Sequence, residues 1–155
     1  MSSDEQEVFR RLAVELRMLE GTAETLESRM NFVNTVLTEL TYARMTLEGV
    51  EKEKPDAPLF VPIGGGSYIK TKLDSADKVL VGVGVGVAIE RTTTEAKQTV
   101  QNRISEIEKS RAALQQQMVQ VMGRIQEDRD RLQELSTKLS QAEGSTGVQK
   151  AERRP

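Results

Sequence analysis

The sequence contains no cysteine, histidine or tryptophan, and only 3% of its 155 residues are aromatic. Without cysteine or histidine, the chain has no disulfides, no thiolate nucleophile, no imidazole base and neither of the two commonest ligands of transition metals. A hydrophobic fraction of 37% with so few aromatics leaves material for a thin core only. These absences argue against an enzyme and against a bound metal or cofactor.

Charge of one sign is not concentrated anywhere in the chain. The 22 basic and 24 acidic residues are interspersed and give a net charge of -2, so no basic stripe points to nucleic acid. No apolar run approaches the length of about 18 residues that suggests a membrane span. The first residues, MSSDEQEVFRR, are too acidic and polar for a secretory signal. We therefore expect a soluble, cytoplasmic protein.

A heptad pattern occupies the first third of the chain. Its apolar residues alternate steps of three and four from Phe9 to Leu47, and only Arg44 interrupts them. A repeat held this long is typical of a coiled-coil seam rather than of the broader apolar face of a globular helix. A glycine and two prolines then end the pattern, which predicts a helix over residues 4–51.

A second heptad pattern fills the last third of the chain. It runs from Val100 to Ala142, with Arg111 and Asp128 as its polar members. Thr92 and Glu95 have the spacing of a capping box, in which each residue bonds the other's backbone N–H at the start of a helix. The pattern predicts a helix that begins at this cap.

The two helices, 4–51 and 92–143, have similar lengths and can fold back on each other as an antiparallel coiled coil. Residues 59–91 would then lie at the closed end, and residues 144–155, which lack periodicity, are expected to form a disordered tail. Two registers are compatible with the seams, with facing residue numbers that sum to about 144 or about 151, and the sequence does not choose between them. In the first register Gly21 and Gly123 lie at one level on the solvent side, where we hypothesise a flexible joint.

The sequence of residues 59–91 predicts short β-strands. Its runs are Leu59 to Ile63, Ser67 to Leu73, Lys78 to Val83 and Val87 to Arg91. Glycine-rich turns join them into two β-hairpins, of which the second has one aliphatic face and one nearly bare face. Isolated hairpins with unpaired edges are an aggregation hazard unless partner strands cover them. The predicted fold class is α+β: a long antiparallel coiled-coil hairpin with two β-hairpins at its closed end.

We expect the hairpins to be the oligomerisation platform and to contribute to an oligomeric β-barrel. The residues expected to take part are Leu59, Val61, Ile63, Tyr68, Ile69, Val79, Val81, Val83, Val87 and Ile89.

The order helix, two hairpins, helix, with LFVPIGGGSYIKTKL followed by KVLVGVGVGVAIER, resembles the alpha class of archaeal prefoldin subunits over roughly residues 5–142. The resemblance implies a chaperone that works without ATP, holds unfolded polypeptides and delivers them to a group II chaperonin. It implies no catalytic residue and no cofactor. It also implies a hexamer with beta-type prefoldin subunits, two alpha and four beta, joined through a double β-barrel.

Under this resemblance, unfolded clients bind at the open ends of the helices, some 65 Å from the hairpins at a rise of about 1.5 Å per residue. The expected client-binding residues are Val8, Phe9, Leu12, Leu132, Leu135 and Leu139. For Phe9 the alternative is an ordinary first residue of the seam. For the whole chain the alternative is an architectural spacer or tethering subunit, which would also use a long coiled coil with a sheet-forming cap.

Overall fold

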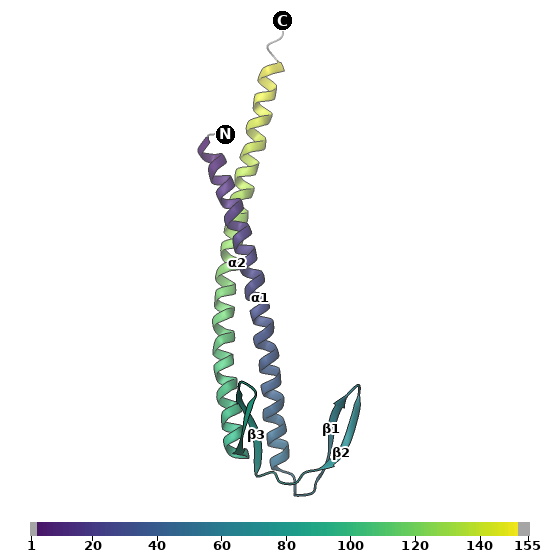
Figure 1. The fold of residues 1–155 in the computed structure, drawn as a ribbon. Helices are drawn as coiled ribbons and strands as arrows, with labels where there is room; N and C mark the ends of the chain where they lie inside the picture. Colours follow the sequence, from purple (N-terminus) through teal and green to yellow (C-terminus); the bar gives the residue numbers. More distant parts are fainter. Residues whose placement is uncertain (1–2, 152–155) are drawn as a thin grey trace. The chain divides into compact units, whose positions relative to one another are not determined.

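The computed structural model describes the backbone of residues 3–151 and the side chains of residues 4–138, 140 and 141. The elements are α1 (Ser3–Glu51), β1 (Pro58–Gly64), β2 (Ser67–Lys72), β3 (Lys78–Gly84), β4 (Val87–Thr92) and α2 (Thr93–Ala151) (Figure 1). The expected α+β fold, two long helices with two antiparallel hairpins between them, is confirmed.

The chain divides into two compact units. One, which we call the helical unit, holds residues 1–32 and 112–155. The other, the hairpin unit, holds residues 33–111 and therefore both β-hairpins.

In the helical unit, the predicted seam residues Leu12, Leu26 and Ile125 are buried. Two ion pairs flank this seam: Arg124 Nη2 lies 2.5 Å from Glu15 Oε1, and Arg129 Nη2 lies 2.7 Å from Glu20 Oε1. The residue numbers of the two pairs sum to 139 and 149, so their mean is 144. The pairs therefore select the register in which facing seam residues sum to about 144.

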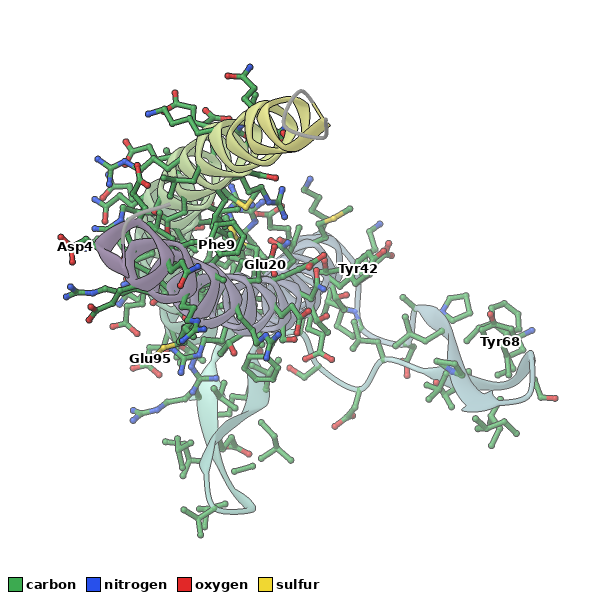
Figure 2. The ribbon with its side chains drawn as sticks, turned by 90° about the horizontal axis from the view of Figure 1, so that it is seen from above. Asp4, Phe9, Glu20, Tyr42, Tyr68 and Glu95 are labelled. Carbon is green, nitrogen blue, oxygen red and sulfur yellow. The ribbon has the colours of Figure 1, made fainter. Side chains whose placement is uncertain are left out.

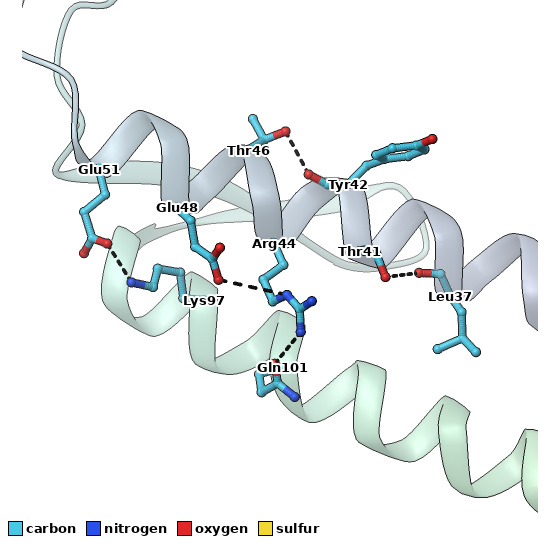
Figure 3. Close-up of polar contacts among 9 residues, drawn as sticks. All are labelled: Leu37, Thr41, Tyr42, Arg44, Thr46, Glu48, Glu51, Lys97 and Gln101. Carbon is cyan, nitrogen blue, oxygen red and sulfur yellow. Dashed lines mark hydrogen bonds and ion pairs between the residues drawn. The ribbon is translucent and has the colours of Figure 1, made fainter.

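The hairpin unit has the same register. Arg44 Nη1 donates to Gln101 Oε1 over 3.3 Å, and Lys97 Nζ lies 2.6 Å from Glu51 Oε2 (Figure 3). In the alternative register, in which facing residue numbers sum to about 151, Arg44 would lie opposite a residue about two turns beyond Gln101 on α2. The seam around these contacts is closed by a buried set of aliphatic residues: Val33, Leu37, Val100 and Ile104.

The N-terminus of α2 is fixed by the predicted capping box. Glu95 Oε2 accepts from the backbone N–H of Thr92 at 3.1 Å, and Thr92 Oγ1 accepts from the backbone N–H of Glu95 at 3.2 Å. Two N–H groups that have no partner within the helix are thereby satisfied. The backbone N–H of Thr93 donates to the carbonyl of Asp77 at 3.0 Å, which ties the cap to the start of β3.

The C-terminal end of α2 differs from the expectation. The helix continues past Gly144 to Ala151, so the helix end predicted at residue 143 is wrong. A glycine inside a helix costs only about 1 kcal/mol relative to alanine, and no proline lies between Gly144 and Pro155, so the sequence there weakens a helix without stopping it. The rest of the expected tail, residues 152–155, lies outside the described residues.

The hairpins share one design. In the first, Phe60 pairs with Lys70; in the second, Leu80 pairs with Glu90, and each has a register shift just before its turn. The turns centre on two residues with positive φ, Gly65 and Gly66 in the first hairpin and Val85 and Gly86 in the second. Positive φ at both central positions is the mark of a type I′ turn, whose twist suits a two-residue hairpin.

Candidate assembly and client-binding surfaces

The second hairpin packs against the helices of the hairpin unit. Val81 is buried, Val79 and Ile89 are half-buried, and the guanidinium of Arg103 on α2 donates through Nη2 to the carbonyl of Gly82 at 2.7 Å. An open cleft of about 370 Å³ remains between β3 and the helices. Its lining is mainly aliphatic: Leu40, Ala43, Leu47, Val79, Val81 and Val100.

The first hairpin is almost wholly exposed. Leu59 and Thr71 are half-buried and the other residues of β1 and β2 are exposed, including Phe60 and Tyr68. Figure 2 shows Tyr68 well away from the helices of the hairpin unit. Apart from Leu59, the aliphatic and aromatic side chains of this hairpin are therefore exposed in the described part of the chain.

The residues expected in the oligomerisation platform thus fall into two groups. Val79, Val81 and Ile89 already bury area against the chain's own helices. The others are exposed except for the half-buried Leu59, and these exposed residues are Val61, Ile63, Tyr68, Ile69, Val83 and Val87. The second group leaves more of its apolar surface open to a partner than the first.

The residues expected to bind clients all lie in the helical unit but differ in accessibility. Val8 is 47% exposed, whereas Phe9, Leu132 and Leu135 are half-buried. Leu12 is only 8% exposed and packs in the seam, so a client could reach it only if the helices part. Leu139 lies within α2, and its side chain is outside those that the structure describes.

Exposed apolar side chains also occur away from the helix ends, where the seam pattern gave no reason to look. In the helical unit they are Val14, Met18, Phe32, Val119 and Met122. Methionine and aromatic side chains adapt well to varied apolar partners. A scan for apolar residues outside the heptad seam would have found them in the sequence.

Asp128 is the one charged residue buried among those described, with 4% of its surface exposed. It occupies a seam position, where the register of about 144 sets it opposite Leu16. Its Oδ2 is buried and has no hydrogen-bond partner in the described part of the chain. A buried carboxylate oxygen without a partner destabilises the folded state.

The electrostatics elsewhere are those of solvated pairs. On the second hairpin, Lys78 Nζ lies 2.9 Å from Glu90 Oε1, and the hydrogen bond and charge of Glu90 raise the pKa of Lys78 above its usual 10.5. The described residues include no group of acidic side chains placed to hold a metal ion. Within the same residues, neither helix has an apolar stretch of the length that crossing a membrane requires.

Comparison with known proteins shows which family this combination of paired helices and exposed hairpins belongs to. The family model for prefoldin subunits matches residues 19–141. The chain belongs to the prefoldin family. It is 32% identical over 113 residues to the prefoldin alpha subunit of Methanopyrus kandleri, covering 73% of this chain and 72% of that one. It is also 32% identical over 133 residues to the alpha subunit of Pyrococcus horikoshii, covering 84% of this chain and 88% of that one.

A solved structure agrees at the level of the fold. The filamentous prefoldin of Methanocaldococcus jannaschii, seen by cryo-electron microscopy, superposes with a TM-score of 0.64 over 72% of this chain and 93% of that one, at 21% identity. Prefoldins are non-enzymatic chaperones that form hetero-oligomeric complexes, so family membership makes this prefoldin chain a chaperone subunit.

Proposed function

We propose that this prefoldin subunit is an ATP-independent holdase that captures unfolded polypeptides with the helical unit and delivers them to a group II chaperonin. The observation that supports this most is the set of apolar side chains left exposed on paired helices that otherwise bury a regular seam, among them Val8, Met18 and Phe32. Solvent-exposed apolar groups on a stable scaffold are what an unfolded client can bury its own apolar segments against.

Capture of this kind needs no nucleotide and no catalytic group. Each apolar contact contributes only about 25 cal/mol per Å² of buried surface. One pair of helices therefore binds a client weakly, and several pairs held in one complex multiply the effective affinity. This is the reason for assembling subunits through their hairpins.

The assembly we propose is the hexamer of two alpha-type and four beta-type subunits, acting in the cytoplasm. The exposed residues of the first hairpin and the tip of the second are its contact surfaces. Clients would meet the helix ends through Val8, Phe9, Leu132, Leu135 and Leu139, with Leu12 joining when the helices part.

Suppression of aggregation tests this function. The purified chain, alone and mixed with an archaeal prefoldin beta subunit, is added without ATP to several unrelated proteins diluted from denaturant, and light scattering is followed. The mixture should lower scattering for all of the clients. If neither sample lowers it for any client, the holdase function is wrong and a spacer or tethering subunit is favoured.

Delivery is tested separately. A client held by the complex should pass to a group II chaperonin and refold only after the chaperonin and ATP are added. If the client stays bound while the chaperonin stays empty, capture stands and delivery does not.

A further inference from the structure

The two faces of the first hairpin differ in chemistry. Residues that pair directly across an antiparallel sheet point to the same side of it, and successive pairs point to opposite sides. One face is aliphatic apart from a threonine and is formed by the pairs Leu59–Thr71 and Val61–Ile69. The opposite face, which we call the aromatic–basic face, is formed by the pairs Pro58–Lys72, Phe60–Lys70 and Pro62–Tyr68.

The aromatic–basic face is open to solvent and carries charge of one sign. Phe60 is 67% exposed and Tyr68 is 62% exposed, so both rings have a free flat side. Lys70 and Lys72 are also exposed, and neither forms an ion pair within the described part of the chain. They are the only charged residues in the range 57–73. Charge is evenly mixed along the chain as a whole, but not on this hairpin.

Assembly through the hairpins leaves this face uncovered. Along each strand of a barrel, residues that point into the interior alternate with residues that point outward. The aliphatic face suits the interior, because a lysine buried there would lose its hydration without gaining a partner. The aromatic–basic face is then the outer surface of the barrel. Tyr68, which we expected to take part in oligomerisation, lies on this outer side.

The spacing of the four side chains fits a chain of nucleotides. Phe60 and Tyr68 are diagonal neighbours across the two strands, which sets their backbones about 7–8 Å apart. Lys70 and Lys72 are two residues apart on β2, or about 7 Å, which is close to the separation of successive phosphates in an extended single strand. Exposed aromatic rings on a sheet, flanked by basic side chains, are a common platform on which unpaired bases stack.

We propose that the aromatic–basic face binds single-stranded nucleic acid, with bases stacked on Phe60 and Tyr68 and phosphates beside Lys70 and Lys72. This is a binding activity beyond the proposed holdase function. It rests on that function only in taking the aliphatic face as the one covered by assembly.

An acidic polypeptide fits the same charge less well. The backbone N–H and C=O groups of β1 and β2 lie in the plane of the sheet, so the face itself offers none of them to a ligand. A peptide lying flat on the rings would bury its own backbone groups without partners, which costs free energy. A base buries its flat side on a ring while its polar edge stays in water. The face therefore favours nucleotides.

Fluorescence anisotropy with a labelled oligothymidylate tests the proposal. The full chain is titrated alone and after assembly with an archaeal prefoldin beta subunit, and the beta subunit alone serves as the blank. An oligonucleotide of the same length without bases has the same phosphates, and the parent chain should bind it at least about fivefold more weakly, because stacking is lost. A glutamate-only peptide of equal charge should also bind more weakly than oligothymidylate.

Variants separate the two parts of the site. Phe60→Leu and Tyr68→Leu should each raise the dissociation constant for oligothymidylate by about fivefold, whereas Tyr68→Phe, which keeps the ring, should stay within about twofold. Lys70→Gln with Lys72→Gln should reduce the slope of log affinity against log salt by about 1 to 1.5. Lys109→Gln with Lys138→Gln removes the same charge from exposed positions on α2 and should leave the slope unchanged. Far-UV circular dichroism verifies that each variant is folded.

Several results would overturn the site. They are no binding of oligothymidylate up to about 0.1 mM chain, the weak end of non-specific nucleic-acid binding; equal binding of the base-free strand; and loss of binding on assembly, which would mean that subunits cover the face. Tighter binding of the glutamate peptide would assign the face to an acidic polypeptide instead. A complex that binds oligothymidylate but suppresses no aggregation would sink the holdase function and leave this site intact, and the reverse result would do the opposite.

Discussion

Val85 occupies, in the turn of the second hairpin, the position that Gly65 occupies in the first. Their φ angles are 52° and 56°, both in the left-handed region. Glycine adopts this conformation freely, whereas a β-branched residue is strained there. The Val85 side chain is 104% exposed, so no contact within the described chain offsets the strain.

Replacing Val85 with asparagine should therefore stabilise the second hairpin. Asn-Gly is a strongly preferred pair for a type I′ turn, and relief of the left-handed strain is worth about 1 kcal/mol. Hydrogen exchange of the β3 and β4 amides should slow, because opening of the hairpin becomes less favourable. Gly65→Val is the reciprocal control and should speed exchange in β1 and β2 by a similar factor. Faster exchange in Val85→Asn would contradict the strain argument.

The sequence predicted the elements of this fold because the two periodicities are long and unmixed. The seam from Phe9 to Leu47 and the capping box at Thr92 and Glu95 are local patterns, and the structure has both. The register was not predictable, because two alignments of the seams bury similar aliphatic sets. The flanking pairs Glu15–Arg124 and Glu20–Arg129 decide it, and they become evident only when the helices are side by side.

The candidate site was predictable only in part. The sequence identified the hairpins as the exposed apolar element, and most of their expected residues are exposed. It gave no reason to separate Val79 and Val81, which face the chain's own helices, from Val61 and Ile69, which do not. Strand alternation assigns a residue to a face of a sheet, and only the tertiary packing tells which face is already covered.

Replacing Asp128 with leucine should stabilise the helical unit. The substitution removes a buried carboxylate oxygen that has no partner and adds apolar surface to the seam opposite Leu16, which together are worth about 1–3 kcal/mol. Urea unfolding followed by circular dichroism should show a higher midpoint with little change in slope. Glu127→Leu, on the exposed side of the same turn, is the control and should move stability by less than about 0.5 kcal/mol. A midpoint that falls in Asp128→Leu would mean that the carboxylate is satisfied in solution.

Alanine at Gly21 and Gly123 tests the proposed joint in the helical unit. Both glycines are exposed, and a Cβ added to either meets no other atom within 4 Å, so the substitutions fit without strain. Each should stabilise its helix by about 1 kcal/mol. The hypothesis further expects the double variant to exchange its amides near both positions more slowly and to hold fewer kinds of client. Unchanged client capture in a more stable, more rigid double variant would show that the glycines are not a functional joint.

Two phenylalanines of the helical unit separate client capture at the helix ends from capture along the helices. Phe9 is half-buried near the start of α1, and Phe32 is 70% exposed further along it. Both are changed to alanine, which removes the same side chain in each case. If clients bind at the ends, Phe9→Ala should raise the concentration of complex needed for half-maximal suppression of aggregation by about threefold, a loss of about 0.7 kcal/mol, and Phe32→Ala should leave it unchanged.

Unfolding of each variant is measured alongside, because Phe9→Ala also removes a seam contact. An equal effect of both substitutions would place capture along the exposed apolar residues of the helices, including Met18 and Val119, rather than at their ends.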